Sequence, residues 1–514
     1  MVTPTTPNPF DIPELRHQLS QFVTTKTACS CARVSKTWTA TFISVIWFEV
    51  DFAVHPRFTT LPRSIITKHG QFIRKVKNAK TFVQVSALTN PSIRFLRSLE
   101  VETTATVLQH EYAYEVVSRN NVCLQELDLY AATTPETSKW YSMIHYVSVP
   151  ALVQFTGASS SFLLGQGGGP ITSKLKTLTL TYLCLTQHGL VAILQASPSL
   201  TELRLVGTDI VGRSKRSFRH SGVTVLATWL KNIIQTDTDH VEDYDGPSLL
   251  AYFPSLQALH ICDLKEPWLT RMATTTTSSE VTTTTPTSRI NSRIKKVLTD
   301  NCPNLTIFQL QGETGAIIPQ FCLNTPRQLT KIAFHYPHTT TETIIAILQH
   351  QSTLQAVSIF CMDNIFITSR DRVVAVKDHF RDSGHVLQLL PRSCPRLEVL
   401  SVHLHEMDMD IVERNGWICK GLRVLRVRIK ELDTEAKISR ALGLWYEWLK
   451  VKSRRSSTSA GERGGSGGCA GEGEGEEGMS LLDRSIEARV ARHLLQFEKL
   501  ETIWLGYKTW SLRG

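Results

Sequence analysis

The sequence predicts an α/β repeat protein: a curved, horseshoe-shaped solenoid with parallel strands on its concave face, preceded by a small domain of three helices. Two observations predict this fold. The pattern Leu-x-x-Leu-x-Leu, with Ile, Val or Phe substituting, recurs eleven times, and an apolar helical segment outside that pattern precedes the first copy. In uninterrupted stretches the copies begin 23–28 residues apart. That spacing is typical of leucine-rich repeats.

The copies cover most of the chain after residue 90. They begin at Leu96, Leu124, Leu175, Leu200, Leu256, Leu305, Leu329, Leu354, Leu397, Leu422 and Leu500. A weaker copy begins at Leu152, with Phe155 in its second position. Such regular recurrence predicts one structural unit for each copy.

Each unit is expected to hold one short strand and one helix. The last two apolar residues of the motif alternate inward, so the residues between them face outward. A helical stripe ends ahead of many copies, as in Leu190, Ile193 and Leu194 before Pro198-Ser199-Leu200. Proline stops the helix and forces an extended entry into the strand. Since no unit can bury its apolar side alone, the units must stack.

The domain boundaries follow from these patterns. We expect a disordered N-terminus at 1–7, a helical domain at 8–50 and the repeat solenoid at 51–514. Gaps longer than one period, or runs too polar to pack, predict insertions near 206–250, 270–290 and 361–385. The Gly, Ser and Glu-rich run at 453–478 has no periodicity and predicts a disordered loop.

Composition excludes several classes of protein. Apolar residues make up 42% of the 514 residues and charged residues 20%, values of neither a disordered chain nor a membrane protein. A net charge of +10 is mild at this length, and no concentrated basic stripe predicts nucleic-acid binding. The 11 cysteines are scattered without a C-x-x-C pair, and there is no signal peptide or spanning segment. We expect an intracellular protein, cytoplasmic, nuclear or both.

The N-terminal segment predicts compact helices. A helical stretch opens near Pro13, with Leu15, Leu19, Phe22 and Val23 on roughly one face, and Asp11 is a plausible N-cap. Further helical stretches are expected from Lys26 to Trp38 and from Trp38 to Phe48. About 40 residues this rich in Trp, Ile and Phe are too few to bury them all, which indicates a partner surface.

This segment resembles an F-box. The stretch Ile12-Pro13-Glu14-Leu15, then Leu19 and Phe22, then Val34-Ser35-Lys36-Thr37-Trp38 is similar to the family pattern Leu-Pro-x-Glu, spaced aliphatics, Val-Cys-(Lys/Arg)-x-Trp. Two residues depart from that pattern: Ile12 replaces the Leu and Ser35 replaces the Cys. Followed by the repeats, the segment resembles the start of an F-box/leucine-rich-repeat protein.

The resemblance implies a substrate-recognition subunit of a cullin-RING ubiquitin ligase, acting in ubiquitin-dependent protein degradation. In such SCF complexes the F-box docks on the adaptor subunit that bridges to the cullin scaffold, and the repeats hold a target protein. The implied adaptor-binding residues are Ile12, Pro13, Leu15, Leu19, Val34 and Trp38. Alternatively, these side chains pack the three helices together.

Target binding is expected on the concave face, at the outward positions of the strands. Aromatic, Arg, His and Gln side chains are typical of interaction surfaces. The candidates are Tyr130, Arg204, His260, Gln309, His335, Phe360, His403, Arg426, Arg428 and Trp504. The simpler alternative for each is a solvated position with no partner. The identity of the target is not readable from these residues.

No motif predicts catalysis, a metal or a cofactor. The match to G-x-S-x-G at Gly464–Gly468 lies in low-complexity sequence, without the strand and helix that a nucleophile elbow needs. His403-Leu404-His405 places two imidazoles on one strand face, but no third ligand follows at metal-binding spacing. The basic run Lys450–Arg455 is either a nuclear import signal or a solvated segment. A hydrolytic enzyme ranks last among the functional hypotheses.

Two hypotheses remain. In the first, the chain is a non-catalytic adaptor that captures a protein for ubiquitination. In the second, it is a repeat scaffold without a ligase link, whose N-terminal helices only cap the solenoid, since repeat arrays need such caps.

Overall fold

The protein is described from a computed structural model, which forms two compact units. The first unit comprises Met1–Leu256 with Thr275–Thr277, and the second comprises Gln257–Thr274 with Ser278–Gly514. The structure describes residues 12–103, 107–131, 174–181, 184–206, 208–211, 218–229, 249–262, 298–311, 317–335, 340–360, 386–458, 485–505 and 508–511.

Three short helices open the first unit: α1 (Pro13–Ser20), α2 (Thr25–Ala32) and α3 (Lys36–Ile46). The predicted second helix, Lys26 to Trp38, is therefore wrong as one element. Ser35 interrupts it, because its side chain accepts a hydrogen bond from the Trp38 N–H (3.3 Å) and so caps the start of α3. Ile12, which makes no capping bond, precedes α1, and the predicted cap Asp11 lies outside the described residues.

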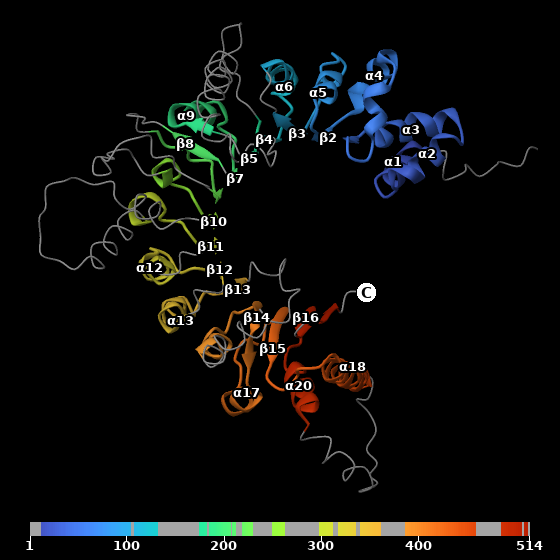
Figure 1. The fold of residues 1–514 in the computed structure, drawn as a ribbon. Coiled ribbons are helices and arrows are strands. Elements are labelled where there is room, and N and C mark those ends of the chain that lie inside the picture. Colours follow the sequence, from blue (N-terminus) through green and yellow to red (C-terminus); the bar gives the residue numbers. More distant parts are fainter. Residues whose placement is uncertain are drawn as a thin grey trace, which may run out of the picture. The chain divides into compact units, whose positions relative to one another are not determined.

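The main sheet of the first unit is parallel, with its strands in chain order. Helices alternate with strands and lie on one side of the sheet (Figure 1). The strands are β1 (Glu49–Asp51), β2 (Lys75–Ala79), β3 (Ser98–Thr103), β4 (Glu126–Ala131), β5 (Thr177–Thr181), β7 (Glu202–Val206) and β9 (Val225–Trp229). The helices are α4 (Arg63–His69), α5 (Phe82–Leu88), α6 (Val107–Asn120) and α9 (Gln187–Ala196), with 3-10 turns at Pro56–Thr60, Gly70–Phe72 and Leu249–Tyr252. Strands β6 (Cys184–Thr186) and β8 (Asp209–Val211) pair separately.

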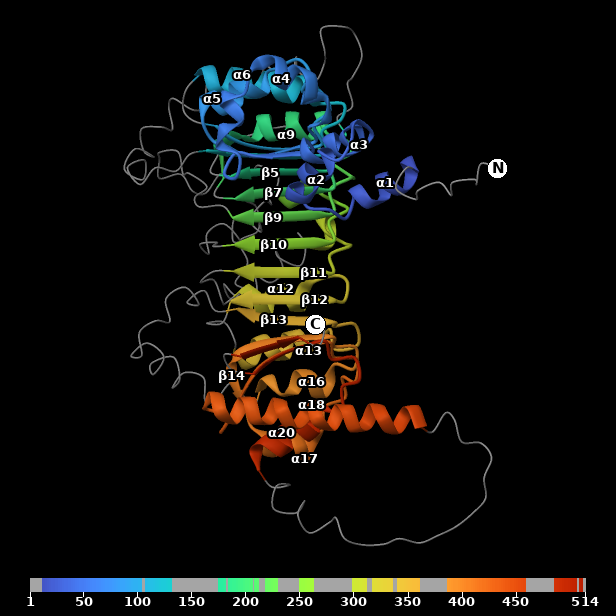
Figure 2. The same cartoon turned by 90° about the vertical axis from the view of Figure 1, so that its right-hand side faces the viewer.

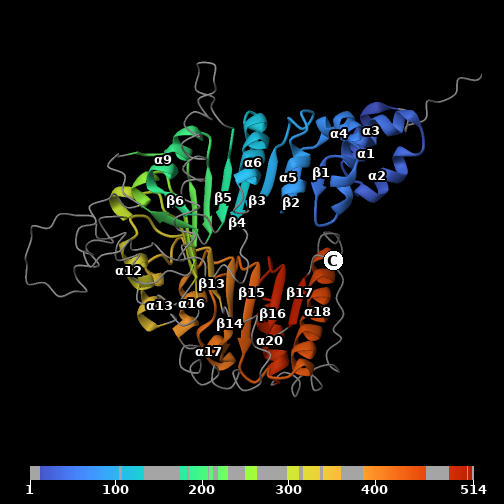
Figure 3. The same ribbon diagram turned by 45° about the horizontal axis from the view of Figure 1, so that its top comes forward.

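The second unit repeats this arrangement, and its strands lie side by side in Figure 2. Its parallel strands are β10 (Ala258–Cys262), β11 (Ile307–Gln311), β12 (Lys331–His335), β13 (Ala356–Phe360), β14 (Val399–Met407), β15 (Val424–Ile429) and β16 (Thr502–Leu505). Strand β17 (Lys508–Ser511) pairs antiparallel with β16, as Figure 3 also shows. The helices are α12 (Ile317–Asn324), α13 (Thr341–Leu348), α16 (Leu389–Ser393), α17 (Met409–Asn415), α18 (Glu435–Thr458) and α20 (Ile486–Leu494).

The repeat motif sets the register of both sheets. In each unit the second apolar residue of every copy lies opposite that of the next, as Leu99 does to Leu127. The aligned residues are Leu99, Leu127, Leu178 and Leu203 in the first unit, and Leu259, Phe308, Ile332, Val357, Leu400, Leu425 and Ile503 in the second. All are buried, and each is worth about 1.5–3 kcal/mol relative to an exposed side chain. This architecture is compatible with the predicted leucine-rich-repeat solenoid.

Three strands of the main parallel sheet were not predicted, nor was the separate parallel pair β6 and β8. Strands β1 and β2 precede the first recognised copy, and β9 lies within the insertion predicted near 206–250. That insertion is therefore partly wrong, because it contains a repeat strand: Leu226 aligns with Leu203 and is fully buried. Thr228 stands at the third apolar position of this copy, which hid the pattern. The weak copy at Leu152 and the insertions at 270–290 and 361–385 lie outside the described residues.

The predicted loop at 453–478 begins too early. Helix α18 continues to Thr458, so six residues of that segment are helical, and 459–478 lie outside the described residues. Within the described residues, no helix combines the length and apolarity that a membrane span requires.

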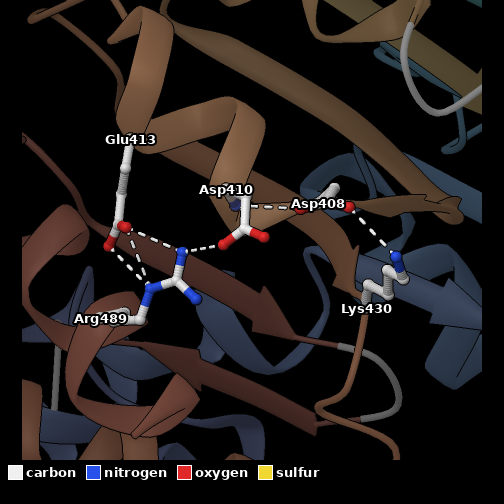
Figure 4. Close-up of polar contacts among 5 residues, drawn as sticks. All are labelled: Asp408, Asp410, Glu413, Lys430 and Arg489. Carbon is white, nitrogen blue, oxygen red and sulfur yellow. Dashed lines mark hydrogen bonds and ion pairs between the residues drawn. The ribbon is translucent and has the colours of Figure 1, made fainter. Parts of the chain in front are cut away.

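Helices α17 and α20 are joined by a charged network (Figure 4). The Arg489 guanidinium donates to both carboxylate oxygens of Glu413 (2.8–3.1 Å) and to Asp410 (2.5 Å). Asp408 caps α17 through the Asp410 N–H (2.9 Å) and pairs with Lys430 (3.1 Å). The carboxylates raise the pKa of Arg489. Because these groups are part-exposed and already paired with each other, the network is a structural link between the helices.

A buried asparagine joins the end of α6 to the turn that leads into β3. Asn120, which ends α6, accepts a hydrogen bond from the Leu96 N–H (2.9 Å). Its amide donates to the carbonyls of Ile93 (3.2 Å) and Val116 (2.8 Å). The side chain thus replaces water for backbone groups in a turn that is closed to solvent.

Replacing Asn120 with alanine is expected to destabilise the protein by about 2 kcal/mol, because it leaves the Leu96 N–H and the Ile93 carbonyl buried without partners. Urea denaturation measures this loss. The control is Asn415→Ala, which removes an exposed amide bonded to Ile411 and should cost less than about 0.5 kcal/mol. Equal midpoints for N120A and the wild type would contradict this role.

Buried histidines likewise bond to buried backbone groups in both units. In the second unit His350 accepts a hydrogen bond from the Leu329 N–H (3.1 Å) and donates from Nε2 to the Cys322 carbonyl (2.9 Å). In the first unit His220 makes an equivalent pair of bonds. Both patterns assign the neutral Nε2–H tautomer. Burial lowers the pKa of His350, which agrees with a neutral ring.

Candidate functional site

The N-terminal helices expose four large apolar side chains. Ile12 and Leu15 lie at the start of α1 and are 38% and 43% exposed. Phe22 follows the end of α1 and is 85% exposed, and Val34, in the turn between α2 and α3, is 66% exposed. We call these four residues the exposed apolar set. Exposed apolar side chains that form a contiguous patch usually mark an interaction site.

The interior of these helices is too small to take in that set. Within 12–46 the buried apolar side chains are Ala28 and Phe42. Trp38, a predicted adaptor-binding residue, stacks on Phe42 with ring centroids 5.4 Å apart and is half-buried, as is Leu19. The structure therefore gives Trp38 an internal packing contact, whereas Ile12, Pro13, Leu15 and Val34 are exposed.

A groove of about 580 Å³ separates the helices from the first repeat strand. Its walls come from α2, the end of α3, β1 and the 3-10 turn at Pro56–Thr60. Trp47 and Phe58 meet edge to face inside it (6.2 Å), and Val50 and Leu61 add to its apolar lining. Its polar groups are Thr25, Cys29, Glu49, His55 and Arg57.

The sheet face of the first unit that points away from the helices carries carboxylates. Glu100 on β3 lies directly opposite Asp128 on β4, and Glu102 lies opposite Tyr130. Arg204, a predicted target-binding residue, is exposed on β7 but pairs with Glu202 on its own strand (2.6 Å). The cation is thereby neutralised, and Glu100 and Asp128 have no salt-bridge partner within 4 Å among the described residues.

Burial raises the pKa of several side chains on this face. Burial and the adjacent Glu100 carboxylate raise the pKa of Asp128 to about 6, while Arg204 acts in the opposite direction. Burial also raises the pKa of Glu102, and burial together with the nearby carboxylates raises the pKa of Tyr130. The face therefore favours a cation beside Asp128.

Replacing Asp128 with asparagine is expected to stabilise the protein at pH 7 by up to about 1 kcal/mol, allowing for solvent screening of a half-buried group. The folded pKa lies above the unfolded one, so the folded state binds more protons and stability falls as pH rises from about 4 to 6. Urea midpoints at pH 4 and pH 7 test this. The gain should be present at pH 7 and small at pH 4, and a lower midpoint for D128N at pH 7 would contradict it.

The corresponding face of the second unit is different. His260 and Gln309 lie opposite each other on β10 and β11 and share a hydrogen bond (2.8 Å). Arg426 on β15 lies over the ring of Trp504 on β16, with 5.1 Å from Cζ to the ring centroid. Arg428 pairs with Glu406 (3.1 Å).

The other predicted target-binding residues keep their strand positions. His335 ends β12 and lies opposite Phe360 at the end of β13, and His403 lies in β14. Among the described residues, no three His, Cys, Asp or Glu side chains gather as metal ligands.

Sequence reasoning missed two groups. Glu100 and Asp128 occupy the same outward position of the motif as Arg204, but the search favoured aromatic, Arg, His and Gln side chains. Phe22 was expected on the same helix face as Leu15 and Leu19, whereas α1 ends at Ser20 and leaves the ring in solvent. The signal available was the polar stretch Thr24–Thr27, which begins two residues after Phe22 and predicts a helix break.

Comparisons with known proteins add little. No family model matches the sequence, and no curated protein matches it significantly. Among solved structures, a chain from the crystal structure of the Rad7 and Elc1 complex in yeast is similar at 11% sequence identity, covering 84% of this chain and 96% of that chain, with a TM-score of 0.33. A TM-score this low carries no argument, so fold and function rest on the residues of this chain.

Proposed function

We propose that this protein is a non-catalytic substrate-recognition adaptor of an SCF-type ubiquitin ligase. In this proposal the N-terminal helices dock on the adaptor subunit that bridges to the cullin scaffold, and the repeats bind a target protein. The proposal includes no nucleic acid, membrane, metal or cofactor, and it places the protein in the cytoplasm, the nucleus or both.

The exposed apolar set carries this proposal. It lies on the segment whose residues resemble an F-box, and three of its four members, Ile12, Leu15 and Val34, are residues that the resemblance implies for docking. The repeats that follow offer a sheet face that none of the described helices covers, which suits the holding of a protein.

A pull-down with the purified adaptor–cullin pair tests the proposal. The full-length wild-type chain should bind, and an Ile12→Asp, Pro13→Ala double variant should not, because a carboxylate would be buried without a partner in the interface. Val122→Asp is the matched control: it places the same charge on an exposed apolar position (54%) distant in sequence from the helices. Equal binding by wild type and the double variant would refute the proposal.

One observation favours a second function, that of a repeat scaffold capped by its N-terminal helices. Strand β1 begins three residues after α3, and the backbone N–H of Arg74 donates to the carbonyl of Phe48 (2.9 Å), which ties the end of the helices to the first repeat. This arrangement suits a cap on a repeat scaffold with no ligase link. The same pull-down separates the two: a cap alone gives no binding by the wild type.

A further inference from the structure

Along one row of outward residues in the second unit, the side chains change abruptly from small to large. Ser358 on β13, Ser401 on β14, Arg426 on β15 and Trp504 on β16 lie opposite one another in register. Ala333 on β12 continues the row. A row of three small side chains, of which Ser401 is buried, thus leads to an arginine stacked on a tryptophan.

Arg426 differs from the neighbouring arginines. Arg423 binds Glu501 (3.0 Å) and Arg428 binds Glu406 (3.1 Å), so each of those charges is neutralised. Among the described residues no carboxylate lies within salt-bridge distance of Arg426, and its buried Nε makes no hydrogen bond. The guanidinium lies over the Trp504 ring, and its two terminal nitrogens make no hydrogen bond or ion pair with a described residue.

We propose that Arg426 and Trp504 bind the carboxylate of an Asp or Glu side chain in the target protein. This inference rests on the proposed function, because it names the chemistry that the repeats would recognise. A planar guanidinium fixed on an indole ring presents paired N–H donors, which match the two oxygens of a carboxylate.

The local charge favours a carboxylate over a phosphate. Arg426 supplies one uncompensated positive charge, and Arg428 supplies none because Glu406 cancels it. A phosphate dianion would carry excess charge here and would be repelled by the Glu406 carboxylate. A carboxylate matches the single charge.

The rest of the face agrees with an acidic segment. Lys331 on β12 is exposed at an outward position, and the carboxylate described on this face, Glu406, is already paired. On the first unit the balance is reversed, with Glu100 and Asp128 unpaired and Arg204 neutralised. An acidic segment is therefore complementary to the second unit.

A degenerate peptide array tests this inference without the ligase. Nonapeptides with one central position fixed as Asp, Glu, Asn, Gln, Lys or phosphoserine are probed with the full-length protein. We expect about tenfold more binding for Asp or Glu than for Asn or Gln, a difference expected for hydrogen bonds to charged groups. The preference should weaken as salt is raised.

Two variants at Arg426 make the test specific. Arg426→Met should abolish the preference for acids, and Arg426→Glu should shift it to Lys. Arg423→Met, which removes a nearby arginine that is already paired with Glu501, is the control and should keep the wild-type preference. Thermal unfolding of each variant confirms that it is folded.

Three results would overturn the inference: equal signals for acids and their amides, stronger binding of phosphoserine, or an acid preference that survives R426M. Adaptor binding is measured separately by the pull-down above, in which R426M should behave as wild type. If the pull-down succeeds and the array fails, the ligase function stands and the Arg426 inference fails. If the array succeeds and the pull-down fails, the protein is a peptide-binding scaffold without a ligase link.

Discussion

Replacing Phe22 with alanine is expected to weaken binding to the adaptor–cullin pair roughly 100-fold, the scale of an aromatic hot spot. The ring is 85% exposed in the free protein, so the protein gains little from it unless a partner covers it. Its burial in an interface would be the largest apolar gain available to these helices. Calorimetric titration of the full-length protein with the purified pair measures the change.

The matched control is Val122→Ala, which truncates an exposed apolar side chain (54%) in the turn after α6. Both variants should unfold at the wild-type temperature, because neither removes a buried contact. An unchanged dissociation constant for F22A would show that Phe22 is not part of the docking surface. A large loss of thermal stability would show instead that the ring is part of the fold.

Acid is expected to destabilise the second unit through His493. This ring lies in α20, 8% exposed, with Trp417 edge-on at 4.7 Å and Phe497 at 5.2 Å. Burial and then the nearby Lys420 charge lower its pKa to about 4. The unfolded state therefore binds more protons between pH 6.5 and 4. Stability is complete above pH 6.5 and is lost as pH falls through that window.

The expected loss attributable to His493 is about 3 kcal/mol between pH 7.5 and pH 4. Urea denaturation at both pH values measures it, with His493→Phe as the comparison, since a phenyl ring fills the same space without titrating. His350 and the carboxylates titrate in both proteins and cancel in the difference. A pH dependence as steep in H493F as in the wild type would exclude His493 as its cause.

The repeat strands could be predicted because their signal is local and periodic. Residues such as Leu99 and Leu127 occupy one motif position, and that position fixes both burial and register. Strand β9 was missed because Thr228 replaces the last apolar residue, while the Leu203 row supplies the pairing that the sequence pattern lacks.

The candidate sites were predictable in position but only partly in chemistry. The outward positions of Arg204 and Arg426 are equivalent in sequence, yet one is paired with Glu202 and the other is stacked on Trp504. The neighbour of Arg426 is Trp504, which lies 78 residues further along the chain. The repeat pattern does not predict which residue stands at that neighbouring position. Exposure of Val34 likewise depends on the break between α2 and α3, where Ser35 caps the start of α3.

Amide hydrogen exchange of the full-length protein, with and without the purified adaptor–cullin pair, tests the central claim most directly. Exchange reports which backbone segments a partner covers. We predict slower exchange in α1, in the turn before α2 and around Val34, with strands β10–β16 unchanged. Protection confined to the strands, or no protection at saturating partner, would contradict the assignment of the N-terminal helices as the docking element.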